Sequence, residues 1–112
     1  MTCIFCQILA RELPGEILYE DEELGVIKDI NPEAPIHLLI IPKRHIDSIN
    51  SLDETTAQIG AKMFLAAKKM AEAQGIQSGY KVLINSGREA GQQVRHLHMH
   101  LLGGWKRMQG RR

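Results

Sequence analysis

Three histidines occupy alternate positions near the end of the chain, in the segment His96-Leu97-His98-Met99-His100. On a helix, residues two apart are rotated by about 200°, so the three rings could not share one face. On a strand they do share a face, and the large apolar residues between them project from the other, as in a half-buried strand. The alternation therefore predicts a strand, which we place at residues 94–102, ended by Gly103-Gly104.

This row of imidazoles has a structural interpretation and a functional one. The structural one is a histidine-rich exposed face, or a metal site made from two or three of the rings. Imidazole also acts as a nucleophile, a general acid or a partner of anions near neutral pH, so one row can divide these tasks on one substrate. Because three of the chain's five histidines alternate strictly, we predict a functional site.

The other strands are short and come in runs, with one long helix inserted late among them. The predicted short elements are a helix over residues 5–10 and strands over residues 17–20, 24–29, 37–41 and 80–85. This order favours an α+β domain with an antiparallel sheet over a βαβ repeat. We expect one domain over residues 1–112.

The long helix has a start signal, an apolar stripe and an end signal. Ser51-Leu-Asp-Glu54 has the form of a capping box, and Gly75 suits the position just after a helix end. The stripe consists of Ile59, Met63, Ala66, Ala67 and Met70. A second apolar edge consists of Ala57, Ala61, Phe64 and Leu65. That edge indicates either a dimer partner or a wider contact with the core.

Composition excludes several classes of protein. The 14 basic and 13 acidic residues give a formal charge of +1, which argues against a nucleic-acid binder with a broad cationic face. No apolar run approaches the roughly 20 residues that span a bilayer, so we expect no membrane segment. The first residues lack the basic region of a signal peptide, and we expect a cytoplasmic protein with reduced thiols.

Cys3-Ile-Phe-Cys6 is a bare Cys-x-x-Cys pair, which has three interpretations. It is a redox pair, two inert buried thiols, or half of a zinc site. The redox motif expects a βαβ setting, which the predicted elements do not provide. Zinc needs two further ligands.

Several segments resemble one protein family. His96-Leu-His98-Met-His100-Leu-Leu resembles the histidine-triad motif, His-φ-His-φ-His-φ-φ, in which φ is apolar. The stretch from Asp29 to His45, with Gly91-Gln-Gln-Val94 and Gly103-Gly-Trp105, resembles the Hint branch, the histidine-triad nucleotide-binding proteins. The resemblance implies a five-stranded antiparallel sheet with one long and one short helix, paired into a homodimer with a continuous sheet.

The resemblance also assigns roles to the histidines. The family's middle histidine is the nucleophile, so His98 is expected to attack the α-phosphorus of a purine nucleoside phosphoramidate or a related nucleotide such as an aminoacyl adenylate. Water would then hydrolyse the covalent nucleotidyl-histidine. His100 is expected to contact the phosphate oxygens and the leaving group. The carbonyl of His96 would orient His98, and His37 would be a fourth, supporting histidine.

A nucleotide site follows from the same resemblance. The apolar positions expected around the purine are Ile4, Phe5, Ile8, Ile27 and Ile30. Asp29 resembles the acidic residue that binds the ribose hydroxyls. The groups expected around the phosphate are Asn85, Gly91, Gln92, Gln93 and Val94, with His98 and His100. Many relatives have Ser or Thr in place of Gln93, and that hydroxyl contacts the leaving group, so the resemblance leaves the leaving-group preference open.

A metal site follows as well. Some bacterial relatives, and the related galactose-phosphate uridylyltransferases, bind a structural zinc through Cys, Cys, His and His at equivalent positions. The resemblance thus implies zinc at Cys3, Cys6, His45 and His96, closed by four ligands and structural in role. It would pin the N-terminal segment against the catalytic strand. We expect no organic cofactor.

Two other functions compete with the phosphoramidase. A zinc-stabilised nucleotide-binding module without catalysis would keep the metal ligands but would leave His98 and His100 without a role. A dinucleoside polyphosphate hydrolase of the Fhit-like branch would use the same nucleophile, although the ending Gly103-Gly104-Trp105 is more similar to the Hint branch.

Overall fold

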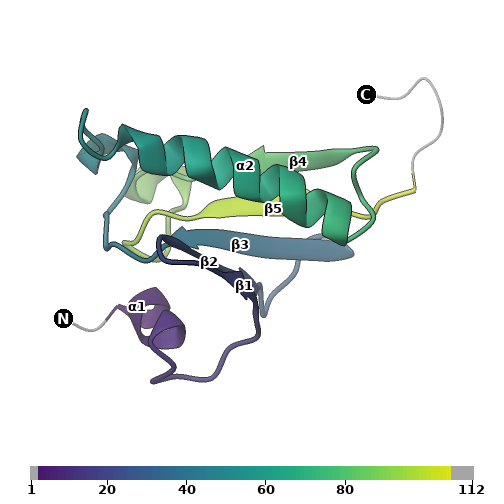
Figure 1. Cartoon of the computed structure of the whole chain (residues 1–112), viewed down its shortest axis with the longest axis horizontal. Helices are drawn as coiled ribbons and strands as arrows, with labels where there is room; N and C mark the ends of the chain where they lie inside the picture. Colours follow the sequence, from purple (N-terminus) through teal and green to yellow (C-terminus); the bar gives the residue numbers. More distant parts are fainter. Residues whose placement is uncertain (1–2, 107–112) are drawn as a thin grey trace.

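The computed structural model describes residues 3–106 and builds them around one antiparallel sheet (Figure 1). The strands are β1 (Ile17–Glu20), β2 (Leu24–Lys28), β3 (Ile36–Pro42), β4 (Tyr80–Leu83) and β5 (Met99–Gly103), in the order β1-β2-β3-β5-β4. The helices are α1 (Ile4–Leu9) and α2 (Ala57–Ala73), with single 3₁₀ turns at η1 (Ile49–Ser51) and η2 (Arg88–Ala90). The predicted α+β class and five-stranded antiparallel sheet are confirmed. No helix in the described part of the chain has the length and apolarity to cross a membrane.

The two helices cover opposite faces of the sheet (Figure 1). Side chains of β3 alternate between them: Leu38 and Ile40 belong to the core under α2, whereas Leu39 and Ile41 belong to the smaller core under α1. Because both faces of β3 are covered, its sequence is a continuous apolar run and not an alternation. The strand β3 therefore lies between the main core and the α1 side of the sheet, where the histidines lie.

The long helix starts later than the sequence predicts. Asp53 Oδ1 accepts hydrogen bonds from the backbone nitrogens of Thr55 and Thr56, at 2.9 and 3.1 Å, and Thr56 Oγ1 accepts one from Asp53 N at 2.9 Å. The capping box predicted at Ser51 and Glu54 is therefore wrong, and the reciprocal pair lies two residues further on. Ser51 instead ends the turn η1, and the extended backbone at Leu52 separates that turn from the helix.

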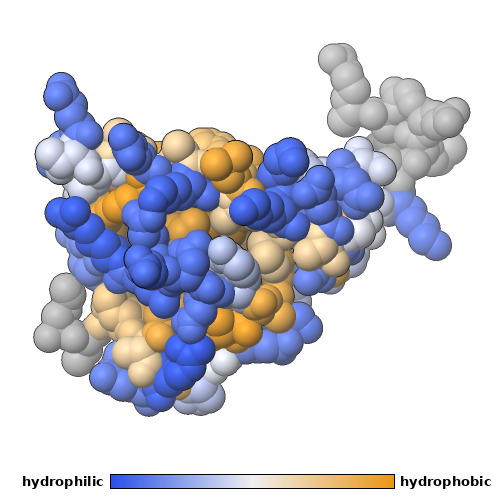
Figure 2. All heavy atoms as spheres, in the orientation of Figure 1, coloured by the Kyte–Doolittle hydropathy of each residue, from blue (hydrophilic) through white to orange (hydrophobic). Residues whose placement is uncertain are grey.

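The stripe predicted on α2 packs into the core, with Met63, Ala66, Ala67 and Met70 buried and Ile59 half-buried. The second apolar edge stays at the surface, with Phe64 57% and Leu65 59% exposed. Figure 2 shows apolar areas among hydrophilic side chains on this face of the molecule. The edge thus makes no wider contact with the core of its own chain.

The last strand is shorter than predicted. It begins at Met99, which pairs with Ile40, and the segment of residues 94–98 has no ladder partner. The ladder with β3 stops at Ile40, although β3 continues to Pro42, a residue without a backbone donor. Only His100 of the three histidines lies within the strand. The β4 strand also stops early, at Leu83 and not at residue 85.

The alternation of faces nevertheless continues through the unpaired segment. Leu97 is 1% exposed and lies in the core under α2. His96 and His98 point to the α1 side, where both rings contact Phe5 edge to face. The prediction that the histidines and the apolar residues face opposite ways is correct, although regular strand geometry does not produce it.

Candidate functional site

The ring of His98 is fixed by a neighbouring main-chain carbonyl. His98 Nδ1 lies 2.7 Å from the carbonyl oxygen of His96. Because a carbonyl only accepts, Nδ1 carries the proton and donates it, which leaves the lone pair on Nε2. Burial lowers the pKa of His98, so the ring is neutral near pH 7. Nε2 is then a free nitrogen lone pair with a set orientation.

A second chain of hydrogen bonds fixes His100 in the opposite tautomer. The backbone nitrogen of Glu33 donates to His37 Nδ1 at 3.0 Å, so His37 carries its proton on Nε2. His37 Nε2 lies 2.8 Å from His100 Nδ1 and donates to it, which leaves the proton of His100 on Nε2. His37 has a side chain only 1% exposed. This series of hydrogen bonds therefore begins at the backbone of a loop residue, Glu33, and ends at the Nε2–H of His100.

His100 Nε2 is the one buried side-chain nitrogen or oxygen without a hydrogen-bond partner among residues 3–106. Its ring centroid lies 5.1 Å from that of His98. Burial, followed by the neighbouring rings of His98 and His37, lowers the pKa of His100, while Asp29 and Glu33 act in the opposite direction. A buried donor without a partner is costly, and a ligand in front of His98 would provide the acceptor.

Both histidines line a cavity of about 480 Å³ between α1, the end of β2 and the loop before β5. The predicted nucleotide contacts that line it are Ile4, Phe5, Ile8, Ile27, Asp29, Ile30, Asn85, Gly91, Gln93, Val94, His98 and His100. Phe5 is buried with its ring edge-on to His98 at 5.0 Å, whereas Ile30 is 87% exposed at the rim. Residues from four separate parts of the chain thus form one concave surface of the size that a nucleotide requires.

Gln92 lies outside this lining. Its amide oxygen accepts a hydrogen bond from Gly87 N at 2.8 Å, and its amide nitrogen donates to the carbonyls of Asp47 and Val94 at 2.6 and 2.9 Å. These three bonds tie the loop before β5 to the segment after β3. The structure therefore places Gln92 where it shapes the loop, next to Gly91, whose φ of 87° suits a glycine.

The sequence did not single out several residues of the lining. They are Leu13, Pro14, Gly15, Lys28, Asn31, Glu33 and Leu39. Lys28 and Asn31 flank the predicted Asp29 and Ile30 in the sequence, so this adjacency could have suggested them as cavity residues. Leu39 lies in a continuous apolar run, and only the sheet order reveals which of its residues face α1.

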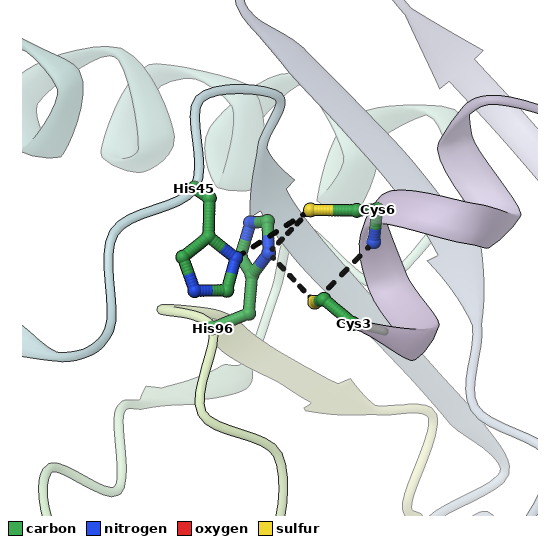
Figure 3. A group of neighbouring side chains, drawn as sticks. All are labelled: Cys3, Cys6, His45 and His96. Atoms are coloured by element: carbon green, nitrogen blue, oxygen red, sulfur yellow. Dashed lines mark hydrogen bonds between the residues drawn. The ribbon is translucent and has the colours of Figure 1, made fainter. Parts of the chain in front are cut away.

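Cys3, Cys6, His45 and His96 form a second group, whose ligand atoms all lie within 4.8 Å of one another. Figure 3 shows both cysteines on the α1 side and both imidazoles pointing toward the sulfur atoms. His96 Nδ1 lies 3.3 Å from Cys3 Sγ and 3.5 Å from Cys6 Sγ, and His45 Nδ1 lies 3.5 Å from Cys6 Sγ. The two thiols are free and not bonded to each other. These four residues could hold a metal ion.

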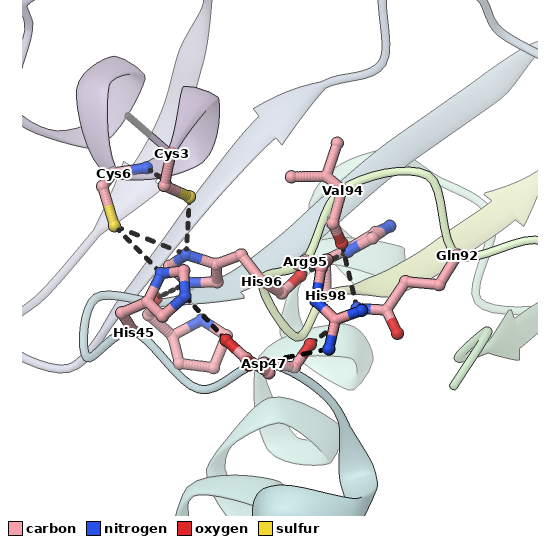
Figure 4. Close-up of polar contacts among 10 residues, drawn as sticks. Cys3, Cys6, His45, Asp47, Gln92, Val94, Arg95, His96 and His98 are labelled. Atoms are coloured by element: carbon pink, nitrogen blue, oxygen red, sulfur yellow. Dashed lines mark hydrogen bonds and ion pairs between the residues drawn. The ribbon is translucent and has the colours of Figure 1, made fainter. Parts of the chain in front are cut away.

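Two hydrogen-bond acceptors behind the imidazoles of His45 and His96 fix the tautomers of these rings in the form that can bind a metal. His96 Nε2 donates to the carbonyl of Pro42 at 2.7 Å, and His45 Nε2 donates to Asp47 Oδ1 at 2.9 Å (Figure 4). Both Nδ1 atoms therefore present lone pairs to the sulfurs, as in carboxylate–histidine–metal arrangements. Burial, together with the Cys3 side chain, raises the pKa of the Cys6 thiol to about 11. A bound cation would displace that proton.

Asp29, His37 and His100 are a second set of ligand-type side chains in close proximity. His37 Nε2 lies 3.3 Å from Asp29 Oδ2 and 2.8 Å from His100 Nδ1. The hydrogen bond between the two rings already accounts for the shorter distance.

The cavity thus receives a lone pair from His98 and an N–H from His100, two residues of the segment that resembles the histidine-triad motif. A family model described as the scavenger mRNA decapping enzyme C-terminal binding region matches residues 2–112. Together with the relatives below, this match shows that the chain belongs to the histidine-triad family, and it confirms the family identified from the sequence.

Two curated relatives and one solved structure illustrate the similarity. The chain is 48% identical over 102 residues to Protein HitA of Neisseria gonorrhoeae, covering 91% of this chain and 95% of that one. It is 43% identical over 102 residues to the purine nucleoside phosphoramidase of Escherichia coli K12, covering 90% and 86%. Among solved structures, the HIT family hydrolase from Clostridium thermocellum has a TM-score of 0.90 at 53% identity, covering 93% of this chain and 91% of that one.

Proposed function

We propose that this protein hydrolyses the P–N bond of purine nucleoside phosphoramidates, or the P–O bond to the leaving group in related nucleotidyl substrates such as aminoacyl adenylates. The observation that carries the proposal is the pair of opposed tautomers: His98 offers a lone pair and His100 offers an N–H to the same cavity. The relative named purine nucleoside phosphoramidase supports this substrate class.

The reaction takes place in two displacements. His98 Nε2 forms a bond to the α-phosphorus while the bond from phosphorus to the leaving nitrogen breaks, and that nitrogen departs as an amine after gaining one proton. Water then attacks the phosphorus of the nucleotidyl-histidine, releasing the nucleoside monophosphate, returning one proton and regenerating neutral His98. Splitting one displacement into two lets each step use a good nucleophile or a good leaving group.

The histidines other than His98 prepare this chemistry. The Nε2–H of His100 donates to the phosphate oxygens and the leaving nitrogen, where negative charge develops. His37 holds that tautomer from behind and does not touch the substrate. The His96 carbonyl keeps the proton of His98 on Nδ1, so the neutral ring presents the lone pair of Nε2 to the substrate.

The rest of the nucleotide follows the shape of the cavity. Ile4, Phe5, Ile8, Ile27 and Ile30 would contact the purine, and Asp29 would accept hydrogen bonds from the ribose hydroxyls. Asn85, Gly91, Gln93 and Val94 lie around the phosphate position. Gln92 would act on this region through the loop that it holds.

The charges of the cavity favour an amine as the leaving group over a polyphosphate. Among the described residues of the lining, Lys28 is the one permanent cation, and Asp29 and Glu33 are carboxylates. A dinucleoside polyphosphate would bring several phosphate charges to a site whose histidines are neutral. Such a substrate fits poorly, because multiple phosphates require clustered cations.

We further propose that Cys3, Cys6, His45 and His96 bind zinc. Their spacing, their exposed lone pairs and the two acceptors behind the imidazoles suit a closed tetrahedral site, in which the metal supplies cross-linking and no reaction chemistry. Free thiols in this arrangement fit the reducing cytoplasm.

A homodimer would cover the exposed edge of α2 at Phe64 and Leu65. Light scattering on the purified protein tests this by measuring the mass of the particle in solution.

A paired assay decides among the candidate functions. Adenosine 5′-phosphoramidate and diadenosine tetraphosphate are offered to the wild-type protein and to His98→Ala, with AMP release measured by chromatography. We expect cleavage of the phosphoramidate by the wild type, with at least about a thousandfold loss in the variant. Preferred cleavage of the tetraphosphate would favour the Fhit-like alternative. Binding of AMP without cleavage of either substrate would favour a non-catalytic module.

A further inference from the structure

One residue belongs to both sites. His96 is completely buried, and its ring contributes Nδ1 to the group of Cys3, Cys6 and His45 while Nε2 is held by Pro42. Its carbonyl oxygen is the acceptor that orients His98. Figure 4 shows His96 between the two cysteines and His98. The ring and the carbonyl of a single residue thus connect the metal group to the nucleophile.

The sheet does not hold this carbonyl in place. The segment of residues 94–98 precedes β5 and has no ladder partner. Its backbone bonds next to the nucleophile are His96 N to Val94 O at 2.8 Å and Leu97 N to Ile46 O at 2.6 Å. The direction of the His96 carbonyl therefore depends on these two bonds and on how the His96 ring is anchored.

The wall of the cavity depends on the same group. Ile4, Phe5 and Ile8 come from α1, which has six residues. An isolated helix shorter than about 12 residues is marginal in water, so α1 needs outside support. Cys3 is its N-cap residue and Cys6 lies in its first turn, and Cys3 Sγ accepts a hydrogen bond from Cys6 N at 3.5 Å. Cross-linking the two thiols to His45 and His96 would fix α1 against the rest of the cavity.

We propose that metal coordination by Cys3, Cys6, His45 and His96 positions both the nucleophile and the apolar wall of the nucleotide site. His96 is the positioning residue for His98, and α1 carries the effect to nucleotide affinity. The metal group therefore does more than stabilise the fold. This inference rests on the proposed function, but its tests do not require turnover.

The first test follows His98 and AMP binding while the metal is removed and returned. The wild-type protein is measured with zinc bound, after chelator and dialysis, and after zinc is added back. With zinc, ¹⁵N NMR should show His98 as one Nδ1–H tautomer; without it, we expect a mixture of tautomers. The Kd for AMP by calorimetry should rise about tenfold or more on zinc removal and should recover on readdition. An unchanged tautomer with an AMP affinity within twofold would overturn the proposal, as would a protein that binds no metal.

Two variants separate positioning from loss of stability. His45→Ala removes a ligand that belongs neither to the cavity lining nor to the contacts of His98, so its effect on AMP must pass through the metal group. Met63→Ala is the matched control, because it truncates a buried side chain under α2, in the core on the other face of the sheet. We expect His45→Ala to reproduce the AMP affinity of the metal-free protein, and Met63→Ala to lower the melting temperature while AMP affinity stays within twofold.

Equal weakening of AMP binding by both variants would assign the effect to general destabilisation and would contradict the proposal. If His45→Ala does not fold, the wild-type measurements with and without zinc still decide. If the zinc-loaded protein shows the single tautomer and binds AMP but cleaves no phosphoramidate, the proposed function fails while the positioning role stands.

Discussion

The most informative single substitution behind the substrate site is His37→Phe. Phenylalanine keeps an aromatic ring of similar size but removes both nitrogens, so His100 Nδ1 loses its donor at 2.8 Å and Glu33 N loses its acceptor at 3.0 Å. A buried polar group left without a partner costs about 1–3 kcal/mol. The bond to Glu33 is only partly buried, so we expect the free energy of unfolding to fall by about 2–4 kcal/mol in total.

The activity should fall for a separate reason. Without His37, the proton of His100 is no longer held on Nε2, and the donor for the phosphate is not always present. We expect kcat to fall about 10- to 100-fold, which corresponds to about 1.4–2.7 kcal/mol in the activation free energy. The affinity for AMP should fall less than kcat, because His37 lies behind His100 and does not line the cavity.

The assay combines steady-state hydrolysis of adenosine 5′-phosphoramidate with urea unfolding and AMP calorimetry. His37→Gln is the control, since its amide N–H can still donate to His100. The expected order of kcat is wild type, then His37→Gln, then His37→Phe. A folded His37→Phe protein with the kcat of the wild type would refute the hydrogen-bond chain as the source of the His100 tautomer.

Three further predictions follow from other contacts. Burial lowers the pKa of His98 and His100 in the folded protein. As the pH falls below about 6.5, the unfolded chain therefore binds more protons than the folded one. Each ring then lowers the free energy of unfolding by up to about 1.4 kcal/mol per pH unit. Urea unfolding at pH 7 and pH 5 checks this, and a double variant with asparagine at both positions should lose less stability than the wild type over that range. A methyl group at Gly25 would overlap Leu9 Cδ2 of α1, so Gly25→Ala should cost about 1–3 kcal/mol in the same assay, and an unchanged midpoint would show that α1 packs less closely on β2. Gln93→Ser should change the ranking of amine leaving groups while AMP affinity stays within about threefold, measured as kcat/KM across a substrate series; an identical ranking would exclude Gln93 from the leaving-group contact.

The sequence predicted the architecture well because its signals are periodic. The alternation around His98 and the stripe through Met63 each place apolar residues on one face, and both faces are as predicted. The ends of elements were predicted less well. The start of β5 depends on where its ladder with β3 stops, which is a long-range property. The start of α2 depends on which of several polar side chains between Ser51 and Thr56 bond to one another's backbone in the turn before the helix.

In the site, too, the sequence predicted the residues better than the contacts that orient them. A family motif identifies His98 and His100, but it carries no information about hydrogen bonds between distant residues. The tautomer of His100 depends on Glu33 N, and the orientation of Gln92 depends on the Asp47 carbonyl. The contacts of His37 with His100 and of Gln92 with Asp47 join residues 63 and 45 positions apart in the sequence, so only the folded chain reveals them. The four candidate metal ligands were predicted as a set by resemblance, and the fold brings them together.

The central claim is that His98 attacks phosphorus and becomes covalently nucleotidylated. Its most direct test is rapid acid-free quenching of the wild-type protein during turnover of adenosine 5′-phosphoramidate, followed by intact mass measurement and peptide mapping. We expect a mass increase of one adenylyl group on the peptide that contains His98, absent from His98→Ala. An adduct on another residue, or undiminished turnover by purified His98→Ala, would contradict it.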